Sequence, residues 1–162
     1  MTSEIQPALV IQRIVPADWV DYNGHMGDFA YAIAFSNAAT AYIDEIGIGL
    51  AYRRDTKSTI YTLDLRIGYR KECHEGDQIT LHVHVLDTDA KRMHLYVEMR
   101  GDDGALLAWN EQVLVHVSQA GETPRTSPFP PEIAARLAAH MEQAKGFVPN
   151  AATTRTLGLK RG

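Results

Sequence analysis

The sequence predicts an α+β fold in which a curved, antiparallel, five-stranded sheet wraps around one long central helix. Three observations lead to this prediction. A short β-like segment comes first, an alanine-rich segment with helical periodicity follows, and four segments of β-like alternation come after it. One strand, one long helix and four further strands can cover the helix only if the sheet curls around it.

The first strand is predicted at residues 8–15, which are rich in β-branched side chains, and Pro16 ends it. After a polar loop, residues 27–46 are predicted to form the long helix. Apolar residues recur there with helical spacing at Phe29, Ile33, Ala34, Ala38, Ala41 and Tyr42. Gly47 and Gly49 are predicted to stop the helix. Its many alanines suit close packing on several sides, so we expect it to be buried.

Residues 50–58 are interpreted as a basic, polar loop, after which the periodicity changes to two. The four predicted strands are residues 60–71, 78–86, 92–100 and 105–118. The short turns between them predict an antiparallel meander. A short amphipathic helix is predicted from Pro131 to about Gln143. The chain is sized for one domain over residues 1–145, and we expect the tail 146–162 to be loose or borrowed by a partner subunit.

Composition argues against several classes of protein. A net charge of −4 does not suit a sequence-independent nucleic-acid binder, and no window near 20 residues is free of charge, so no membrane span is expected. No signal peptide is expected either. The single cysteine, Cys73, excludes an internal disulfide, fits a cytoplasmic location and is predicted to be inert. No metal site is predicted from the isolated strand histidines His82, His84, His94 and His116.

The candidate reactive site is the loop before the long helix, where Asp21, Asn23 and His25 occupy alternate positions. In an extended loop alternate side chains point the same way, so these three polar groups could converge on one water or carbonyl group. The first-turn N–H groups of the following helix could stabilise an oxyanion. In the alternative interpretation, Asp21 and Asn23 only shape a turn and Asp28 caps the helix. The residues alone leave both open.

Two motifs resemble known enzymes. Residues 21–25, Asp-Tyr-Asn-Gly-His, are similar to the Asp-x-Asn-x-His motif of plant acyl-carrier-protein thioesterases, and residues 69–73, Tyr-Arg-Lys-Glu-Cys, are similar to their Tyr-Arg-Arg-Glu-Cys stretch. Residues 8–120 as a whole resemble the hot-dog fold of the 4-hydroxybenzoyl-CoA thioesterase-like families. The resemblance implies thioester hydrolysis without a cofactor, since coenzyme A is part of the substrate. It implies the catalytic residues Asp21, Asn23, His25 and Glu72.

Other segments resemble the betainyl-CoA thioesterases of carnitine catabolism, namely residues 19–26, 46–48, 89–94 and 110–116. This resemblance implies hydrolysis of betainyl-CoA to betaine and CoA. After His25 and Met26, many relatives have an Asn-rich stretch where this chain has Gly27 and Asp28. This departure puts the substrate preference in doubt. The alternatives are another short or aromatic acyl-CoA, a hydratase or dehydratase of the same fold, and a non-catalytic acyl-CoA binding module.

Thioester hydrolysis needs an attacking water or carboxylate and stabilisation of the charge that develops on the carbonyl oxygen. Asp21 could be the general base or the nucleophile, Asn23 would orient the carbonyl or the water, and His25 would polarise the reacting group. A backbone N–H near Gly27 would complete the oxyanion hole. Glu72 could reach the loop within its own subunit or across a dimer interface, or could be a solvated strand-end residue.

The CoA phosphates and the acyl group of the substrate need different binding residues. Lys91 and Arg92 are the predicted pair for the CoA phosphates, because they lie in a segment that the resemblance covers. A quaternary ammonium acyl group could be held through cation–π contacts by three aromatic residues near the loop, Trp19, Tyr22 and Tyr31. Core packing explains such aromatic residues equally well. We expect a homodimer or homotetramer, in which a second copy covers the open sheet edge and completes the site.

Overall fold

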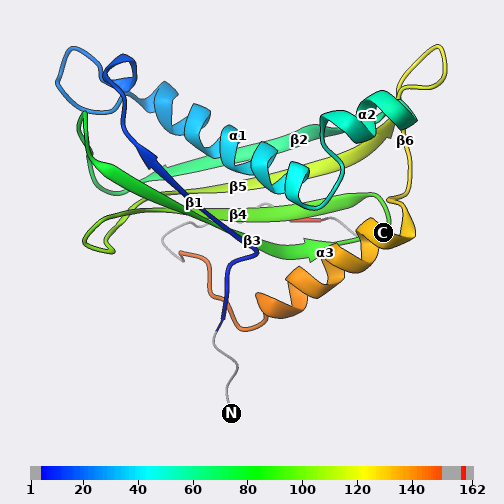
Figure 1. The fold of residues 1–162 in the computed structure, drawn as a ribbon. Helices are drawn as coiled ribbons and strands as arrows, with labels where there is room; N and C mark the ends of the chain where they lie inside the picture. Colours follow the sequence, from blue (N-terminus) through cyan, green and yellow to red (C-terminus); the bar gives the residue numbers. More distant parts are fainter. Residues whose placement is uncertain (1–4, 151–157, 160–162) are drawn as a thin grey trace.

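The computed structural model describes residues 5–150 and 158–159. Its strands are β1 (Leu9–Ile14), β2 (Ser58–Tyr69), β3 (Gln78–Thr88), β4 (Arg92–Gly101), β5 (Leu106–Ser118) and the two-residue β6 (Arg125–Thr126). Its helices are α1 (Asp28–Glu45), α2 (Leu50–Thr56) and α3 (Pro131–Gln143), with a short 3₁₀ turn at Ala17–Trp19. The curved five-stranded sheet and the long helix are confirmed (Figure 1). In the part of the chain described, no helix combines the length and apolar character that crossing a membrane requires.

The strands of the sheet follow the order β1-β3-β4-β5-β2 and pair antiparallel, and β6 pairs with β5. The predicted meander is right for β3, β4 and β5 but wrong for β2, which pairs with β5 instead of β3. The connection at residues 70–77 crosses the end of the sheet between these strands. It is long enough for the three strand spacings, roughly 14 Å, that separate β2 from β3. Turn residues mark where a strand ends, but not which strand becomes its neighbour.

Helix α1 lies along one face of the sheet (Figure 1). It buries Ala30, Tyr31, Ala34, Phe35, Ala38, Ala39 and Tyr42. The small side chains let the helix backbone approach the strands closely, and Gln112 of β5 donates a hydrogen bond to the Phe35 carbonyl at 3.4 Å. At the C-terminal end of α1, the Tyr42 hydroxyl lies 2.8 Å from His140 Nδ1 of α3. The helix is therefore anchored at this end, while its N-terminus faces the predicted reactive loop.

The segment between α1 and β2 differs from the prediction. The predicted loop at residues 50–58 contains α2, and only Lys57, with a left-handed φ of 55°, and Ser58 lie beyond it. Tyr52 of α2 places its hydroxyl 2.9 Å from Nε2 of the buried His116 on β5. This tertiary contact supports a short helix that the local sequence pattern does not reveal.

The outer face of the sheet, opposite α1, carries the start of the C-terminal tail. Phe147 stacks on His84 of β3 with ring centroids 4.0 Å apart. The N–H of Asn150 donates to the Tyr96 hydroxyl at 3.0 Å. Residues 146–150 are thus docked on their own subunit and not loose as predicted, whereas residues 151–157 and 160–162 of the predicted tail lie outside the described residues.

Candidate active site

The loop between the 3₁₀ turn and α1 folds back on itself as a small hairpin. Val20 and Met26 form an antiparallel bridge, and the Asp21 N–H donates to the His25 carbonyl at 2.9 Å. Residues directly opposite each other in an antiparallel pair point to the same face, so Asp21 and His25 are neighbours. Asn23 lies at the exposed tip, where its N–H donates to Asp21 Oδ1 at 2.8 Å. The prediction of an extended loop is therefore wrong. The observed hairpin nevertheless brings two of the three residues, Asp21 and His25, together.

Glu72 reaches this loop through a backbone contact. The Met26 N–H donates to the Cys73 carbonyl at 2.8 Å. This contact places His25, which precedes Met26, beside Glu72, which precedes Cys73. His25 Nε2 consequently lies 3.2 Å from Glu72 Oε2. The pair is partly open to solvent, with the His25 side chain 36% exposed and that of Glu72 69% exposed. Glu72 thus joins the site within its own subunit.

A pocket of about 320 Å³ opens at this point, beside the N-terminus of α1. Its lining residues are Asp21, His25, Met26, Asp28, Tyr31, Tyr69, Arg70, Lys71 and Glu72. Three of the four predicted catalytic residues are among them, and Asn23 is not. The carboxylates and imidazole in this pocket are groups that can activate a water molecule or attack a carbonyl carbon.

The N-terminus of α1 offers a donor for an oxyanion. Its N-cap residue, Gly27, has no side chain to cap the helix, and its N–H already donates to the Trp19 carbonyl at 2.9 Å. The N–H of Asp28, the first helical residue, has no partner within the helix, because no turn precedes it. Asp28 itself accepts a hydrogen bond from the Phe29 N–H through Oδ1 at 2.9 Å. The available oxyanion donor is therefore the Asp28 N–H, next to Gly27 in the first turn of the helix.

A buried tyrosine, Tyr31, lines the pocket and contacts a buried thiol behind it. Tyr31 donates from its hydroxyl to the Lys71 carbonyl at 3.3 Å, and the same hydroxyl lies 3.6 Å from Cys73 Sγ. Burial raises the pKa of the Tyr31 hydroxyl well above its usual value and also raises the pKa of the Cys73 thiol. A protonated, buried thiol is a poor nucleophile, which agrees with the prediction that Cys73 is inert.

Arg70 connects the pocket to the outer face of the sheet. Its Nη2 donates to Asn150 Oδ1 at 2.7 Å. Burial raises the pKa of the nearby Tyr96 to about 12, and the Arg70 charge opposes this effect. The docked start of the tail therefore holds this guanidinium at the side of the sheet that faces away from α1.

The other predicted substrate residues lie elsewhere. Trp19 packs beside Ala34, Ala38 and Leu81, between α1 and the β1 side of the sheet. Tyr22, near the tip of the loop, is 97% exposed. Of the three aromatic residues predicted to hold the acyl group, only Tyr31 lines the pocket.

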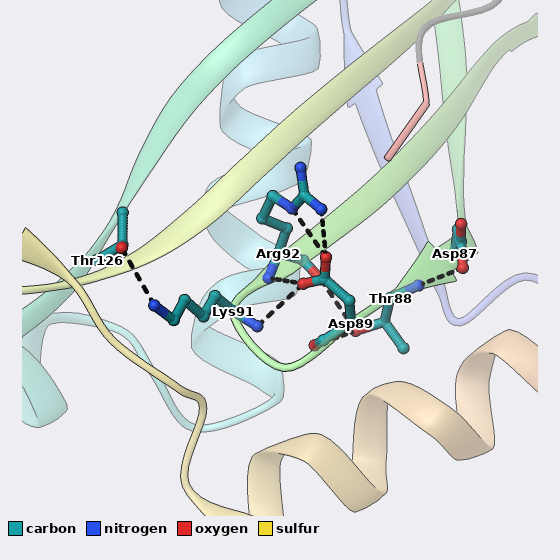
Figure 2. A network of polar contacts seen from close by, with 6 residues as sticks. All are labelled: Asp87, Thr88, Asp89, Lys91, Arg92 and Thr126. Atoms are coloured by element: carbon teal, nitrogen blue, oxygen red, sulfur yellow. Dashed lines mark hydrogen bonds and ion pairs between the residues drawn. The ribbon is translucent and has the colours of Figure 1, made fainter. Parts of the chain in front are cut away.

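Lys91 and Arg92 lie at the opposite end of the sheet, Lys91 in the turn before β4 and Arg92 as the first residue of β4. Figure 2 shows Arg92 turned toward Asp89, which accepts hydrogen bonds from its Nε at 2.8 Å and Nη2 at 2.6 Å. Burial raises the pKa of Asp89, but the hydrogen bonds from Arg92 and from the Lys91 N–H, together with the Arg92 charge, outweigh this effect and hold the pKa below its usual value. Lys91 Nζ reaches Thr126 Oγ1 at 3.5 Å. Both basic residues line a second pocket of about 400 Å³, separate from the one beside α1.

Comparison with known proteins identifies the family. Residues 15–137 match the model of the thioesterase-like superfamily, well over half of the chain. The chain belongs to this superfamily. It is an acyl-CoA thioesterase with the hot-dog fold, as the sequence predicts. Among its described residues, no group of three or more side chains is arranged to hold a metal ion.

Relatives and solved structures of the thioesterase are similar over most of its length. A betainyl-CoA thioesterase of Pseudomonas aeruginosa is 34% identical over 88% of this chain and 89% of its own. An L-carnitine dehydrogenase/betainyl-CoA thioesterase of Ruegeria pomeroyi is 36% identical over 88% of this chain, which spans 28% of that longer protein. A putative thioesterase of Pseudomonas putida KT2440 has a TM-score of 0.78 at 31% identity, covering 96% of this chain and 99% of its own. A Staphylococcus aureus protein in complex with CoA has a TM-score of 0.87 at 24% identity, covering 99% and 100%, a likeness of fold.

Proposed function

We propose that this thioesterase hydrolyses betainyl-CoA to betaine and CoA. The observation that carries the proposal is the similarity to a betainyl-CoA thioesterase over nearly the whole length of both chains. The pocket beside α1 supports it, because it brings a carboxylate, an imidazole and a helix N-terminus to one place. We place the reaction in the cytoplasm, as the cysteine content predicts.

In the proposed reaction, Asp21 acts on the thioester carbonyl. As a general base it takes a proton from water, whose oxygen attacks the carbonyl carbon. As a nucleophile it forms an anhydride with the acyl group, which water then hydrolyses. Either route breaks the C–S bond, and the sulfur leaves as a thiolate that takes up a proton. In this proposal the Asp28 N–H stabilises the negative charge on the carbonyl oxygen.

His25 and Glu72 act as a pair in this proposal. Their 3.2 Å contact lets the carboxylate orient the imidazole, which can then hold the attacking water or protonate the leaving thiolate. Asn23 keeps a smaller role, since the structure places it at the tip of the loop and its N–H shapes the turn around Asp21.

A second copy of the chain is part of the proposal. Edge strand β2 exposes apolar side chains at Tyr61, Leu63, Leu65 and Tyr69, with exposed fractions of 40–57%. An unpaired edge of this kind invites pairing with an identical edge. Pairing centred on Leu65 would set Tyr69 of one subunit opposite Tyr61 of the other. The pocket would then be bordered by both subunits of a homodimer, which could assemble further into a homotetramer.

Such a dimer also gives Lys91 and Arg92 a role in binding CoA phosphates. Within one subunit, Ala108 of β5 pairs with Tyr69, which lines the pocket, and Val115 of β5 pairs with Arg92. These two β5 residues are about 23 Å apart along the strand. Arg92 and Tyr61 both pair with Val115, so they lie at the same height of the sheet. Edge pairing brings the partner's basic pair toward the end of the sheet that holds the pocket.

A panel of acyl-CoA thioesters, followed by the release of free thiol, tests the substrate. We expect the highest kcat/KM for betainyl-CoA and lower values for acetyl-, butyryl- and 4-hydroxybenzoyl-CoA. A higher kcat/KM for an uncharged aliphatic or aromatic ester would assign the alternative substrate class. An absence of thiol release from every ester would contradict the proposed hydrolysis.

A further inference from the structure

One corner of the active-site pocket has the properties of a receptor for a cation. The rings of Tyr31 on α1 and Tyr69 at the end of β2 meet edge to face, with centroids 5.2 Å apart and planes at 88°. Both residues line the pocket. Tyr31 donates its hydroxyl to the Lys71 carbonyl, and Tyr69 donates its hydroxyl to the Asp28 carbonyl at 3.5 Å. With the hydroxyls engaged by the protein, the ring surfaces are what this corner offers to a ligand.

The charges around this corner also favour a cation. Three carboxylates line the pocket, from Asp21, Asp28 and Glu72. Asp28 lies beside Tyr69, whose hydroxyl donates to the Asp28 carbonyl, and burial together with the smaller effect of the Asp28 charge raises the pKa of that hydroxyl. Of the two basic residues in the lining, Arg70 directs its guanidinium to Asn150 on the outer face, which leaves Lys71. The carboxylates therefore outnumber the cations next to the two rings.

A quaternary ammonium group carries no N–H, so a protein cannot bind it through donated hydrogen bonds. Aromatic ring faces and nearby carboxylates are the groups that attract it. In a betainyl thioester a single CH₂ separates this nitrogen from the carbonyl carbon, a distance of roughly 2.5 Å from ordinary bond lengths. The ammonium subsite must therefore share a pocket with the group that attacks the carbonyl, which is where the two tyrosines lie relative to Asp21.

We propose that Tyr31, Tyr69 and Asp28 form the subsite for the ammonium group of the acyl moiety, and that they select thioesters with a short cationic acyl group. This inference rests on the proposed thioesterase function. Tyr69 is the residue of the three that a substitution can probe best, because it is 53% exposed whereas Tyr31 is buried.

The test compares betainyl-CoA with 3,3-dimethylbutanoyl-CoA, a neutral ester of the same shape in which carbon replaces the charged nitrogen. We expect wild-type kcat/KM to favour the cationic ester. In Tyr69→Leu, the ratio of the two kcat/KM values should fall by about 3- to 30-fold, as expected for the loss of one cation–π contact. Tyr69→Phe keeps the ring and should keep the ratio. In Asp28→Asn the ratio should fall, because a nearby negative charge is lost.

The ratio separates this inference from the proposed function. A change in the fraction of folded or dimeric enzyme affects both esters alike and leaves the ratio unchanged. If both esters are cleaved and Tyr69→Leu lowers their kcat/KM values equally, the subsite is overturned while thioester hydrolysis stands. If wild-type enzyme cleaves neither ester, the proposed function and the subsite are both overturned.

Discussion

Replacing Asp21 with asparagine is expected to lower kcat for thioester hydrolysis by about 10²- to 10⁴-fold, the usual contribution of a positioned acid or base. Asparagine keeps the Oδ1 atom that accepts the Asn23 N–H, so the turn should persist while the negative charge is lost. KM should change little, because the substitution removes a group that acts on the reacting carbonyl. Thiol release under steady-state conditions gives both constants.

Asp18→Asn is the matched control for this substitution. Asp18 is an exposed carboxylate in the same segment, within the 3₁₀ turn at Ala17–Trp19, and it does not line the pocket. Its replacement should leave kcat within about twofold of wild type, since exposed surface substitutions usually have small effects. An Asp21→Asn enzyme as active as Asp18→Asn would remove Asp21 from the mechanism.

Leu65→Glu on strand β2 is expected to give a monomer that has lost most of its activity. Leu65 lies at the centre of the exposed apolar residues of the β2 edge, and a charge at a strand edge opposes edge-to-edge pairing. Because the proposed pocket is bordered by both subunits, separating the subunits should lower kcat/KM for betainyl-CoA. Sedimentation velocity and thiol release on the same sample measure the two effects.

Val10→Glu is the matched control at the other edge of the sheet, on β1, where Val10 is 49% exposed. This variant should keep both the assembly and the rate of the wild type. A Leu65→Glu monomer with the full hydrolytic rate would show that one subunit contains a complete site.

The order of elements could be predicted because it depends on periodicity within the chain. The alanine-rich helical pattern and the four segments of period two are local signals, and they correspond to α1 and to β2 through β5. The partner of β2 depends on which strands meet across the sheet, and turn residues carry no such information. Helix α2 was missed for a similar reason, since Tyr52 gains its support from His116, distant in the sequence.

The candidate site shows the same division between local and distant information. The sequence singled out Asp21, His25 and Glu72, and the structure brings these three together, though by pairing across a turn and by a contact between Met26 and Cys73. Proximity in sequence was a poor guide to the acyl pocket, because Trp19 and Tyr22 lie outside it.

No sequence pattern assigns Tyr69 to the site, although it begins the motif that points to Glu72. Its place beside Tyr31 follows from where β2 ends relative to the first turns of α1, which no local pattern specifies. The sequence indicates Asp28 only as a helix cap or as a departure from related sequences, and the structure adds that it lines the pocket.

A crystal structure of the Asp21→Asn enzyme with intact betainyl-CoA is the most direct test of where the thioester is cleaved. We expect the thioester carbonyl carbon beside residue 21, its oxygen facing the Asp28 N–H, and the ammonium group against the rings of Tyr31 and Tyr69. An acyl group bound in the pocket near Lys91 and Arg92, or anywhere away from the N-terminus of α1, would contradict the proposed active site.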